Sequence, residues 1–284
     1  MVRGLYTGVS GMLSEWHRMD VVANNLANLN TTGFKRDDAI FKSFPEMLIR
    51  RLDDNGVVKV PNGSYDIAPF VGKMGTGVEL NEVYTRHEQG IIRNTGNDFD
   101  LALDGKGYFV VKTDRGDRYT RNGSFLIDKD GFLVTKDGFR VQGKQGDIRI
   151  KTNNFQVTEY GEVLENAEFP KEDLGKFVDK NENDWKVPQV VDSLLLVNFY
   201  DERLLRKEGN SFYVATKHSG EAEDKQIGEG RPKVLQGYIE GSNVNPVMEM
   251  TKMIEVQRSY EANQKVVTTH DQLLQKAVND IPRV

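Results

Sequence analysis

The first 34 residues carry an apolar side chain at every third or fourth position, which is the spacing of a helix that packs along another helix. This seam consists of Val2, Leu5, Val9, Met12, Trp16, Met19, Ala23 and Leu26. It ends in an Asn-rich segment, residues 28–33, whose Gly33 can adopt the left-handed conformation that closes a helix. A helix over residues 5–28 would be about 36 Å long. It could not bury its seam alone, so the chain must supply a partner.

A second helix of this kind is predicted at the other end of the chain. Residues 247–278 contain neither Gly nor Pro, and the preceding Pro246 suits the first turn of a helix. The two terminal helices are therefore predicted to form a long antiparallel, coiled-coil-like pair. Asn263 and His270 are the polar residues of the C-terminal seam. They either set the register of the helix pair, as buried polar residues do in coiled coils, or face solvent or a channel. The C-terminal seam consists of Met253, Val256, Tyr260, Asn263, Val267, His270, Leu274 and Ala277.

Between the two ends, apolar residues alternate with a period of two and are separated by Asp-Gly and Asn-Gly pairs, which favour tight hairpin turns. Such short segments predict an antiparallel meander rather than a doubly wound sheet. A charged stretch at 170–188 is expected to be a loop or insertion, and the sequence leaves its role open. The predicted strands lie at about 101–103, 108–112, 125–127, 132–134, 139–141, 148–150, 155–157, 163–164, 190–200, 211–215 and 234–238.

Residues 43–52 show steps of three and four between apolar positions and predict a second, shorter helix. Turn signals follow, with short strands expected near 57–60 and 78–84. The predicted fold class is therefore α+β, with antiparallel terminal helices and an inserted, mostly antiparallel β domain. We divide the chain into an N-terminal helix of the helical core over 1–40, an extended connecting region over 41–90, a β-rich domain over 91–240 and a C-terminal helix over 241–284.

Composition excludes several functions. The net charge of −5 does not provide the basic face that nucleic-acid binding needs. The longest aliphatic run, residues 194–197, is too short to span a bilayer, and the N-terminus does not resemble a secretory signal peptide. The chain has no cysteine, so disulfides and thiol catalysis are excluded. No cofactor or metal site and no enzymatic activity is predicted, because the histidines are scattered and no Gly-x-Ser-x-Gly elbow occurs.

Three groups of motifs, in order along the chain, resemble those of the bacterial flagellar rod and hook proteins. The opening group is NNLANLNTTGFK at 24–35, with GLYT at 4–7 and SGM at 10–12 upstream. The middle group is NDFDLAL at 97–103 and YTRNGSF at 119–125, and the closing group is SNVNPV at 242–247 and MIEVQRSYEANQK at 253–265. The resemblance covers both ends and much of residues 85–143, but not the stretch at 170–188.

This resemblance implies a non-catalytic subunit that stacks helically into the axial structure, with terminal helices lining an inner tube and the β domain facing outward. Its implied partners are copies of itself, other flagellar rod and hook subunits and the flagellar type III export apparatus. Its implied location is the periplasmic rod of the basal body, reached without a cleaved signal peptide. The opening residues 1–7 favour a proximal rod protein over a distal one.

Assembly is expected to rest on the two seams and on the Asn-rich segment that follows the first. Because isolated helices are marginal in water, residues 1–35 and 245–284 are expected to be largely disordered in the free subunit and to fold on assembly. The asparagines are either a frayed helix end or, as the resemblance favours, a cluster that bonds across subunits. The candidate assembly residues are Leu5, Val9, Met12, Trp16, Met19, Asn24, Asn25, Leu26, Asn28, Met253, Val256, Tyr260, Asn263, Val267 and Leu274.

Two functions of other classes stay open on the sequence. One is a β domain that binds cell-wall glycan, which predicts an exposed aromatic platform formed by Tyr108, Phe109 and Tyr119. The other is a wall hydrolase, which would need a pair of carboxylates in a cleft, with Asp98, Asp100 and Asp104 as candidates.

Overall fold

The computed structural model describes residues 2–50, 57–60, 63–66, 70–150, 155–166, 188–209, 211–224 and 231–280. The chain divides into two compact units. The helical unit comprises Met1–Asn24, Asp37–Tyr84 and Val247–Val284, and the β unit comprises Asn25–Arg36 and Thr85–Pro246. Each unit is therefore built from segments that lie far apart in the sequence.

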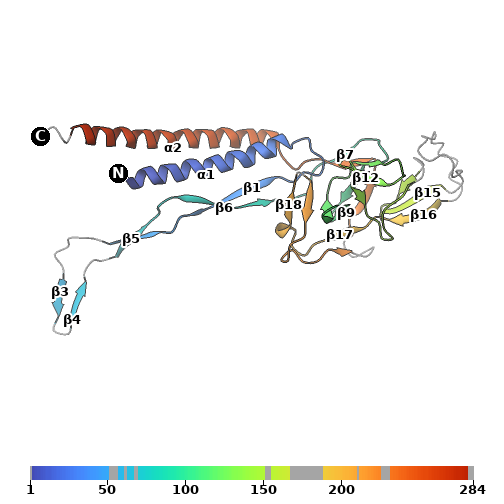
Figure 1. Cartoon of the computed structure of the whole chain (residues 1–284), viewed down its shortest axis with the longest axis horizontal. Helices are drawn as coiled ribbons and strands as arrows, with labels where there is room; N and C mark the ends of the chain where they lie inside the picture. The colour runs from blue at the N-terminus through green and yellow to red at the C-terminus, as the bar shows by residue number, and fades with distance from the viewer. Residues whose placement is uncertain are drawn as a thin grey trace. The chain divides into compact units, whose positions relative to one another are not determined.

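The helical unit contains the two predicted helices. Helix α1 spans Val2–Ala27 and helix α2 spans Pro246–Asp280, so each begins slightly earlier than the periodicity indicated. Gly4 of α1 lies against His270 of α2, and Gly11 lies against Asn263, so the helices run antiparallel and side by side (Figure 1). The predicted pairing of the two ends of the chain is confirmed by these contacts.

Glycines allow the close approach of the two helices. A Cβ atom added at Gly8 would lie 3.0 Å from Val267 Cγ2, and one at Gly11 would lie 3.0 Å from Asn263 Nδ2. Glycines that approach α2 therefore stand one position before each of the predicted seam members Leu5, Val9 and Met12. The sequence pattern missed this because a glycine contributes no apolar side chain to the periodicity, although it permits tight helix packing.

The connecting region is extended and forms hairpin-like strand pairs. β1 (Asp37–Ser43) pairs with β6 (Val78–Thr85), β2 (Met47–Arg50) with β5 (Phe70–Met74), and β3 (Val57–Val60) with β4 (Gly63–Asp66). The helix predicted at residues 43–52 is therefore wrong, because β1 ends at Ser43 and strand β2 occupies Met47–Arg50; residues 51 and 52 lie outside the described residues. Met47 is opposite Met74, so pairing with a strand about 27 residues away replaced the local preference, as tertiary context commonly does. The predicted strands at 57–60 and 78–84 are confirmed.

The β unit is built on a nine-stranded sheet in which every pair with a described register is antiparallel. Its path runs β11-β12-β13-β9-β10-β19-β18, and β17 joins β9 to β20. The strands of this sheet are β9 (Tyr108–Thr113), β10 (Gly116–Thr120), β11 (Phe125–Ile127), β12 (Leu133–Thr135), β13 (Arg140–Val141), β17 (Leu196–Asn198), β18 (Arg206–Glu208), β19 (Phe212–Val214) and β20 (Glu223–Asp224). Between β17 and β18 lies a short 3-10 helix, η2 (Glu202–Leu204).

Smaller sheets complete the β unit. One has the order β14-β15-β16, and two further pairs are β21 with β8 and β22 with β7. Their strands are β7 (Ile92–Asn94), β8 (Leu101–Asp104), β14 (Phe155–Val157), β15 (Glu162–Asn166), β16 (Pro188–Ser193), β21 (Lys233–Gln236) and β22 (Tyr238–Glu240). Strands are thus found near all the predicted positions except 148–150. There Ile148 and Ile150 are buried, Arg149 forms an isolated bridge with Phe132, and the amide of Ile150 donates to the carbonyl of Gly131 (2.7 Å). The stretch at 170–188 lies outside the described residues except for Pro188.

The core of the β unit lies on both faces of strand β9. Successive residues of a strand point to opposite faces, and Tyr108, Phe109, Val110 and Val111 are all buried. Phe109 belongs to a large cluster with residues such as Phe125, while Tyr108 and Val110 belong to a second cluster on the other face. β9 is therefore a central strand, and the aromatic side chains proposed as a glycan platform contribute instead to its packing.

Candidate assembly surface

Helix α1 presents hydroxyl groups to strand β6 along one face. Ser14 Oγ donates to the carbonyl of Val78 (3.1 Å), and Thr7 Oγ1 donates to the carbonyl of Thr76 (3.2 Å). The amide of Val78 in turn donates to Ser10 Oγ (3.4 Å). These bonds satisfy backbone groups at the start of an exposed strand, and they fix which face of α1 is turned away from β6.

The face of α1 that is turned away carries an exposed apolar stripe. Tyr6, Val9, Leu13 and Trp16 recur at steps of three and four, so they lie on one side of the helix. Their exposed fractions range from 45% to 67%. Large apolar side chains in a row on a helix mark an interaction surface rather than a solvated face.

Helix α2 carries exposed apolar residues as well. Val247, Met250 and Ile254 form one stripe near its start, and Val266 and Leu273, seven residues apart, form a second. In contrast, every member of the predicted α2 seam from Met253 to Ala277 is buried or half-buried. The helix pair therefore uses one side of α2 for α1 and leaves apolar groups on other sides uncovered.

The predicted assembly residues fall into three classes of exposure. Val9, Trp16 and Asn24 are exposed, whereas Asn25, Asn28 and Val256 are buried within the single chain. The rest are half-buried: Leu5, Met12, Met19, Leu26, Met253, Tyr260, Asn263, Val267 and Leu274. The exposed residues Tyr6 and Leu13 were missed, although they lie next to the seam in the helical pattern and could have been found by widening it.

The Asn-rich segment forms an ordered turn after α1. Thr31 Oγ1 donates to Asn28 Oδ1 (3.1 Å), and Thr32 Oγ1 donates to Asn122 Oδ1 (2.6 Å). Gly33 has a φ of +68°, as predicted, and a Cβ there would lie 2.5 Å from the amide nitrogen of Asn122. A side chain at position 33 would therefore be excluded by both conformation and space.

A buried ion cluster follows this turn. Lys35 Nζ donates to Glu240 Oε1 (2.5 Å) and to the carbonyl of Glu88 (2.6 Å), and Arg121 Nη1 donates to Glu240 Oε2 (3.4 Å). The amide of Gly90 donates to Glu240 Oε1 (2.8 Å). All three charged side chains are at least 97% buried. Burial lowers the pKa of Lys35, and the carboxylate of Glu240 opposes that shift.

Further contacts hold residues 34–36, the segment that contains Lys35. Lys207 Nζ lies 3.8 Å from the centroid of the buried Phe34 ring and donates to the carbonyl of Lys35 (2.9 Å). Asn243 accepts from the amide of Arg36 (2.7 Å) and donates to the carbonyl of Arg86 (2.9 Å). Residues 31–36, which leave α1, and residues 238–243, which lead to α2, are thereby fixed to each other inside the β unit.

His87 lies beside this cluster and is held neutral. Tyr108 Oη is 2.8 Å from His87 Nδ1. Burial lowers the pKa of His87 to about 4, and the positive charges of Lys35, Arg121 and Lys207 contribute to the shift. The structure therefore resists protonation of His87 over the range in which an unfolded histidine becomes charged.

We expect this to make the β unit sensitive to acid. The pKa of His87 is about 6.5 when unfolded and about 4 when folded, so the unfolded state binds more protons between these values. The unfolding free energy should fall by about 3 kcal/mol through this group as the pH drops from 7 to 4. Urea unfolding of His87→Gln across this range should show a shallower decline. His218→Gln, at an exposed position, is the matched control. If the unfolding free energy of His87→Gln fell with pH as steeply as that of the unchanged chain, His87 would not be the source of the acid sensitivity.

The described residues offer no group of three metal-ligating side chains, and none of their helices has the length and apolar character of a membrane span. The carboxylates considered for hydrolysis have structural roles. Asp100 is buried and accepts from Thr95 Oγ1 (2.7 Å), and Asp104 accepts from Gln89 Nε2 (3.4 Å). The aromatic platform is also absent, since Tyr108 and Phe109 are buried and Tyr119 is half-buried.

Three family models match the chain in sequence order. Residues 5–35 match the model described as flagella basal body rod protein. Residues 102–165 match the flagellar hook protein FlgE/F/G D1 domain, and residues 235–280 match the C-terminal model of the flagellar basal body rod FlgEFG proteins. The matches cover the N-terminal helix with its Asn-rich turn, part of the β unit, and the C-terminal helix.

Similar proteins extend over nearly the whole chain. The flagellar basal-body rod protein FlgG of Bacillus subtilis (strain 168) is 34% identical over 285 residues, covering 98% of this chain and 99% of that protein. The FlgG protein of Caulobacter vibrioides is 36% identical over 276 residues, covering 96% and 97%. The basal-body rod protein FlgF of Caulobacter vibrioides is 32% identical over 286 residues and covers both chains completely.

Proposed function

Because this chain belongs to the family of flagellar basal-body rod proteins, we propose that its terminal helices join it to neighbouring subunits in a helical polymer. It is a structural subunit of the rod and not an enzyme. The observation that carries the proposal is the exposed apolar stripe of α1, Tyr6, Val9, Leu13 and Trp16, together with the uncovered apolar residues of α2.

These surfaces suit an open assembly. The stripe on α1 and the apolar groups on α2 are different surfaces, so a contact of one with the other joins two subunits head to tail. A heterologous contact of this kind generates a helical filament when it does not close into a ring. We propose coiled-coil-like packing between subunits, with copies of this chain and with other rod and hook subunits as the partners.

In the proposed assembly, the rod acts as the drive shaft that transmits torque from motor to hook. Such a role needs the segments that lead to the two terminal helices to be held firmly within the β unit. The buried cluster of Lys35, Arg121 and Glu240 supports it, because it fixes the segments that lead to both helices. Asn25, in the last turn of α1, and Asn28, in the turn that follows, are both buried within the single chain.

The proposed location is the periplasmic part of the basal body. We infer that the flagellar type III export apparatus delivers the subunit there. The opening residues 1–7 favour the proximal segment of the rod, with the distal segment as the alternative. Labelling the protein in purified basal bodies tests this assignment, and a label confined to the hook-proximal end would place it in the distal segment.

The proposal predicts a polymer whose helices form or tighten on assembly. Purified full-length chain at high concentration should give helical filaments in electron microscopy. Circular dichroism should show more helix in the polymer than in the monomer, because isolated helices are marginal in water and gain stability from packing. Equal helicity in both states would contradict coupled folding. A chain that stays monomeric, alone and with other rod subunits, would contradict the proposed assembly.

A further inference from the structure

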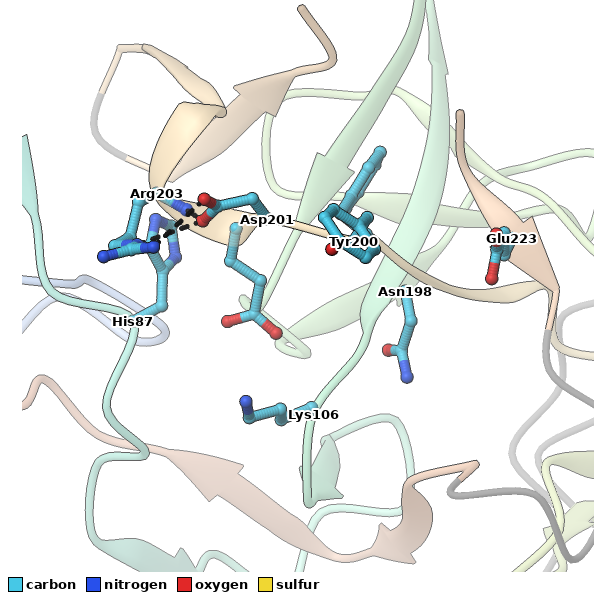
Figure 2. A pocket seen from close by; sticks show the side chains of 9 residues that line it. His87, Lys106, Asn198, Tyr200, Asp201, Arg203 and Glu223 are labelled. Carbon is cyan, nitrogen blue, oxygen red and sulfur yellow. Dashed lines mark hydrogen bonds and ion pairs between the residues drawn. The ribbon is translucent and has the colours of Figure 1, made fainter. Parts of the chain in front are cut away.

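The β unit contains a polar cavity of about 660 Å³ that is lined by residues of β17, η2 and β20 (Figure 2). Arg203 Nε and Nη2 both donate to the carboxylate of Asp201 at 3.1 Å, so these two charges neutralise each other (Figure 2). Among the described residues that line the cavity there is no serine, threonine or methionine. Side chains that are open to a simple chemical change lie instead at the start of helix α2.

Two methionines near the start of α2 are well exposed. Met248 and Met250 each have 52% of their surface accessible. The chain has no cysteine, so its eight methionines carry all of its sulfur. The other methionine of α2, Met253, is half-buried, and so are Met12 and Met19 of α1. Met248 and Met250 are therefore the most exposed methionines of the two terminal helices.

The surroundings of these two methionines differ. Met250 belongs to the α2 stripe, with Val247 three positions before it and Ile254 four positions after it. Met248 stands two positions before Met250, which places it about 160° away around the helix axis. The residues that follow Met248 on its own side are all polar: Thr251, Lys252 and Glu255. The two methionines are thus matched in exposure, but only Met250 lies in an apolar stripe.

The proposed partner of the α2 stripe offers aromatic rings to Met250. In the head-to-tail contact proposed above, the α2 stripe meets the exposed stripe of α1 in a second copy of the chain. That stripe contains Tyr6, which is 67% exposed, and Trp16, which is 50% exposed. A thioether sulfur makes favourable contacts with aromatic rings, and the unbranched side chain adapts to an irregular surface. The thioether of Met250 therefore suits this contact.

A peroxide converts such a thioether into a sulfoxide. The sulfur attacks one oxygen of hydrogen peroxide, the S–O bond forms as the O–O bond breaks, and the other oxygen leaves as water after a proton shift. The sulfur loses two electrons, which reduce the peroxide. Methionine sulfoxide reductases reverse the change with two thiols, which become a disulfide while the oxygen leaves as water. The product is a polar side chain that disrupts methionine-containing apolar surfaces.

We propose that Met250 is a reversible oxidation site that controls assembly of this chain. As a thioether it packs on the α1 stripe of a neighbouring copy, and as a sulfoxide it prevents this contact. The sulfoxide oxygen would have to lose its hydration against apolar side chains, which is costly. The contact also covers the sulfur, so the oxidant acts on the free subunit rather than on the assembled one. The inference rests on the proposed function, because it requires the contact between the two stripes.

The test is a competition between oxidised and unoxidised chains. Purified full-length monomer is treated with limiting hydrogen peroxide, the peroxide is removed, and the chains are allowed to polymerise. Peptide mass spectrometry then measures the sulfoxide at each methionine in the polymer and in the chains left in solution. Sulfoxide at Met250 should be depleted about tenfold or more in the polymer, whereas sulfoxide at Met248 should be equal in both fractions. When preformed polymer is treated, Met248 should be oxidised faster than Met250.

Two leucine variants and a repair step complete the test. Met250→Leu keeps an apolar side chain of similar volume that peroxide does not oxidise, so more of the treated chains should polymerise than for the unchanged protein. Met248→Leu is the matched control and should be as sensitive to peroxide as the unchanged protein. Incubation of the treated monomer with reductases for both sulfoxide epimers should restore polymerisation.

The outcomes separate this inference from the proposed function. If the untreated chain polymerises but sulfoxide at Met250 enters the polymer as freely as sulfoxide at Met248, the inference alone is overturned. Equal peroxide sensitivity of Met250→Leu and the unchanged protein would also overturn it. If the untreated chain does not polymerise, alone or with other rod subunits, the proposed function fails and this inference fails with it.

Discussion

Replacing Glu240 with glutamine is expected to lower the unfolding free energy of the β unit by about 3–5 kcal/mol, the usual cost of breaking a buried ion pair. The substitution keeps the size of the side chain but leaves Lys35 and Arg121 buried without a counter-ion. Stranded buried charges are costly because the interior cannot replace their hydration. Urea unfolding followed by near-UV circular dichroism of the buried tyrosines would measure the loss.

Two comparisons test whether the loss of the buried ion cluster causes the destabilisation of the Glu240→Gln variant. Glu159→Gln removes the partner of Lys233 at a similar distance of 3.0 Å, but that pair is largely exposed, so little change is expected. The double variant Lys35→Met and Glu240→Gln should lose less unfolding free energy than the two single variants together. Each single change leaves the other residue of the pair buried without its partner, whereas the double variant removes both members. If Glu240→Gln were no more destabilising than Glu159→Gln, the cluster would not anchor the turn.

The elements with regular local patterns were predictable from the sequence. Every member of the predicted C-terminal seam from Met253 to Ala277 is buried or half-buried within the single chain, because its spacing of three and four keeps these residues on one face of the helix. Most strands of the β unit followed from the alternation of apolar residues and from Asp-Gly and Asn-Gly turns. The left-handed conformation of Gly33 also followed, because few other residues adopt it.

The features that the sequence did not reveal depend on long-range pairing. Lys35 and Glu240 are 205 positions apart, and neither is distinguished locally from a solvated charge. Strand β2 was mistaken for a helix because its apolar spacing fits both elements, and only its partner β5 decides between them. The close approach of Gly4, Gly8 and Gly11 to α2 was also not predicted, because glycine adds no apolar side chain to the periodicity.

The exposure of Trp16 changes the role expected for this residue. As a seam member it would pack against α2, yet half of its surface is exposed, next to Leu13 on the stripe. A large aromatic side chain that remains exposed in the folded chain suits an anchor for a neighbouring subunit, where truncation of such a residue commonly costs at least 2 kcal/mol. In a polymer this loss of binding free energy recurs at each contact between subunits, so a modest loss at each contact is enough to prevent the polymer from growing.

Trp16→Ala is therefore expected to leave the β unit folded and to block incorporation of the subunit into the rod. The same outcome is expected for Leu26→Ala, whose half-buried side chain ends the seam. In a strain lacking the natural gene, each variant should be produced and exported at normal levels, yet fail to restore motility or to appear in purified basal bodies. Gln264→Ala, an exposed polar position on α2, is the control and should restore both. Normal assembly of the Trp16→Ala variant would show that the exposed stripe of α1 is not the assembly surface, and the contacts between subunits would then have to be sought on α2.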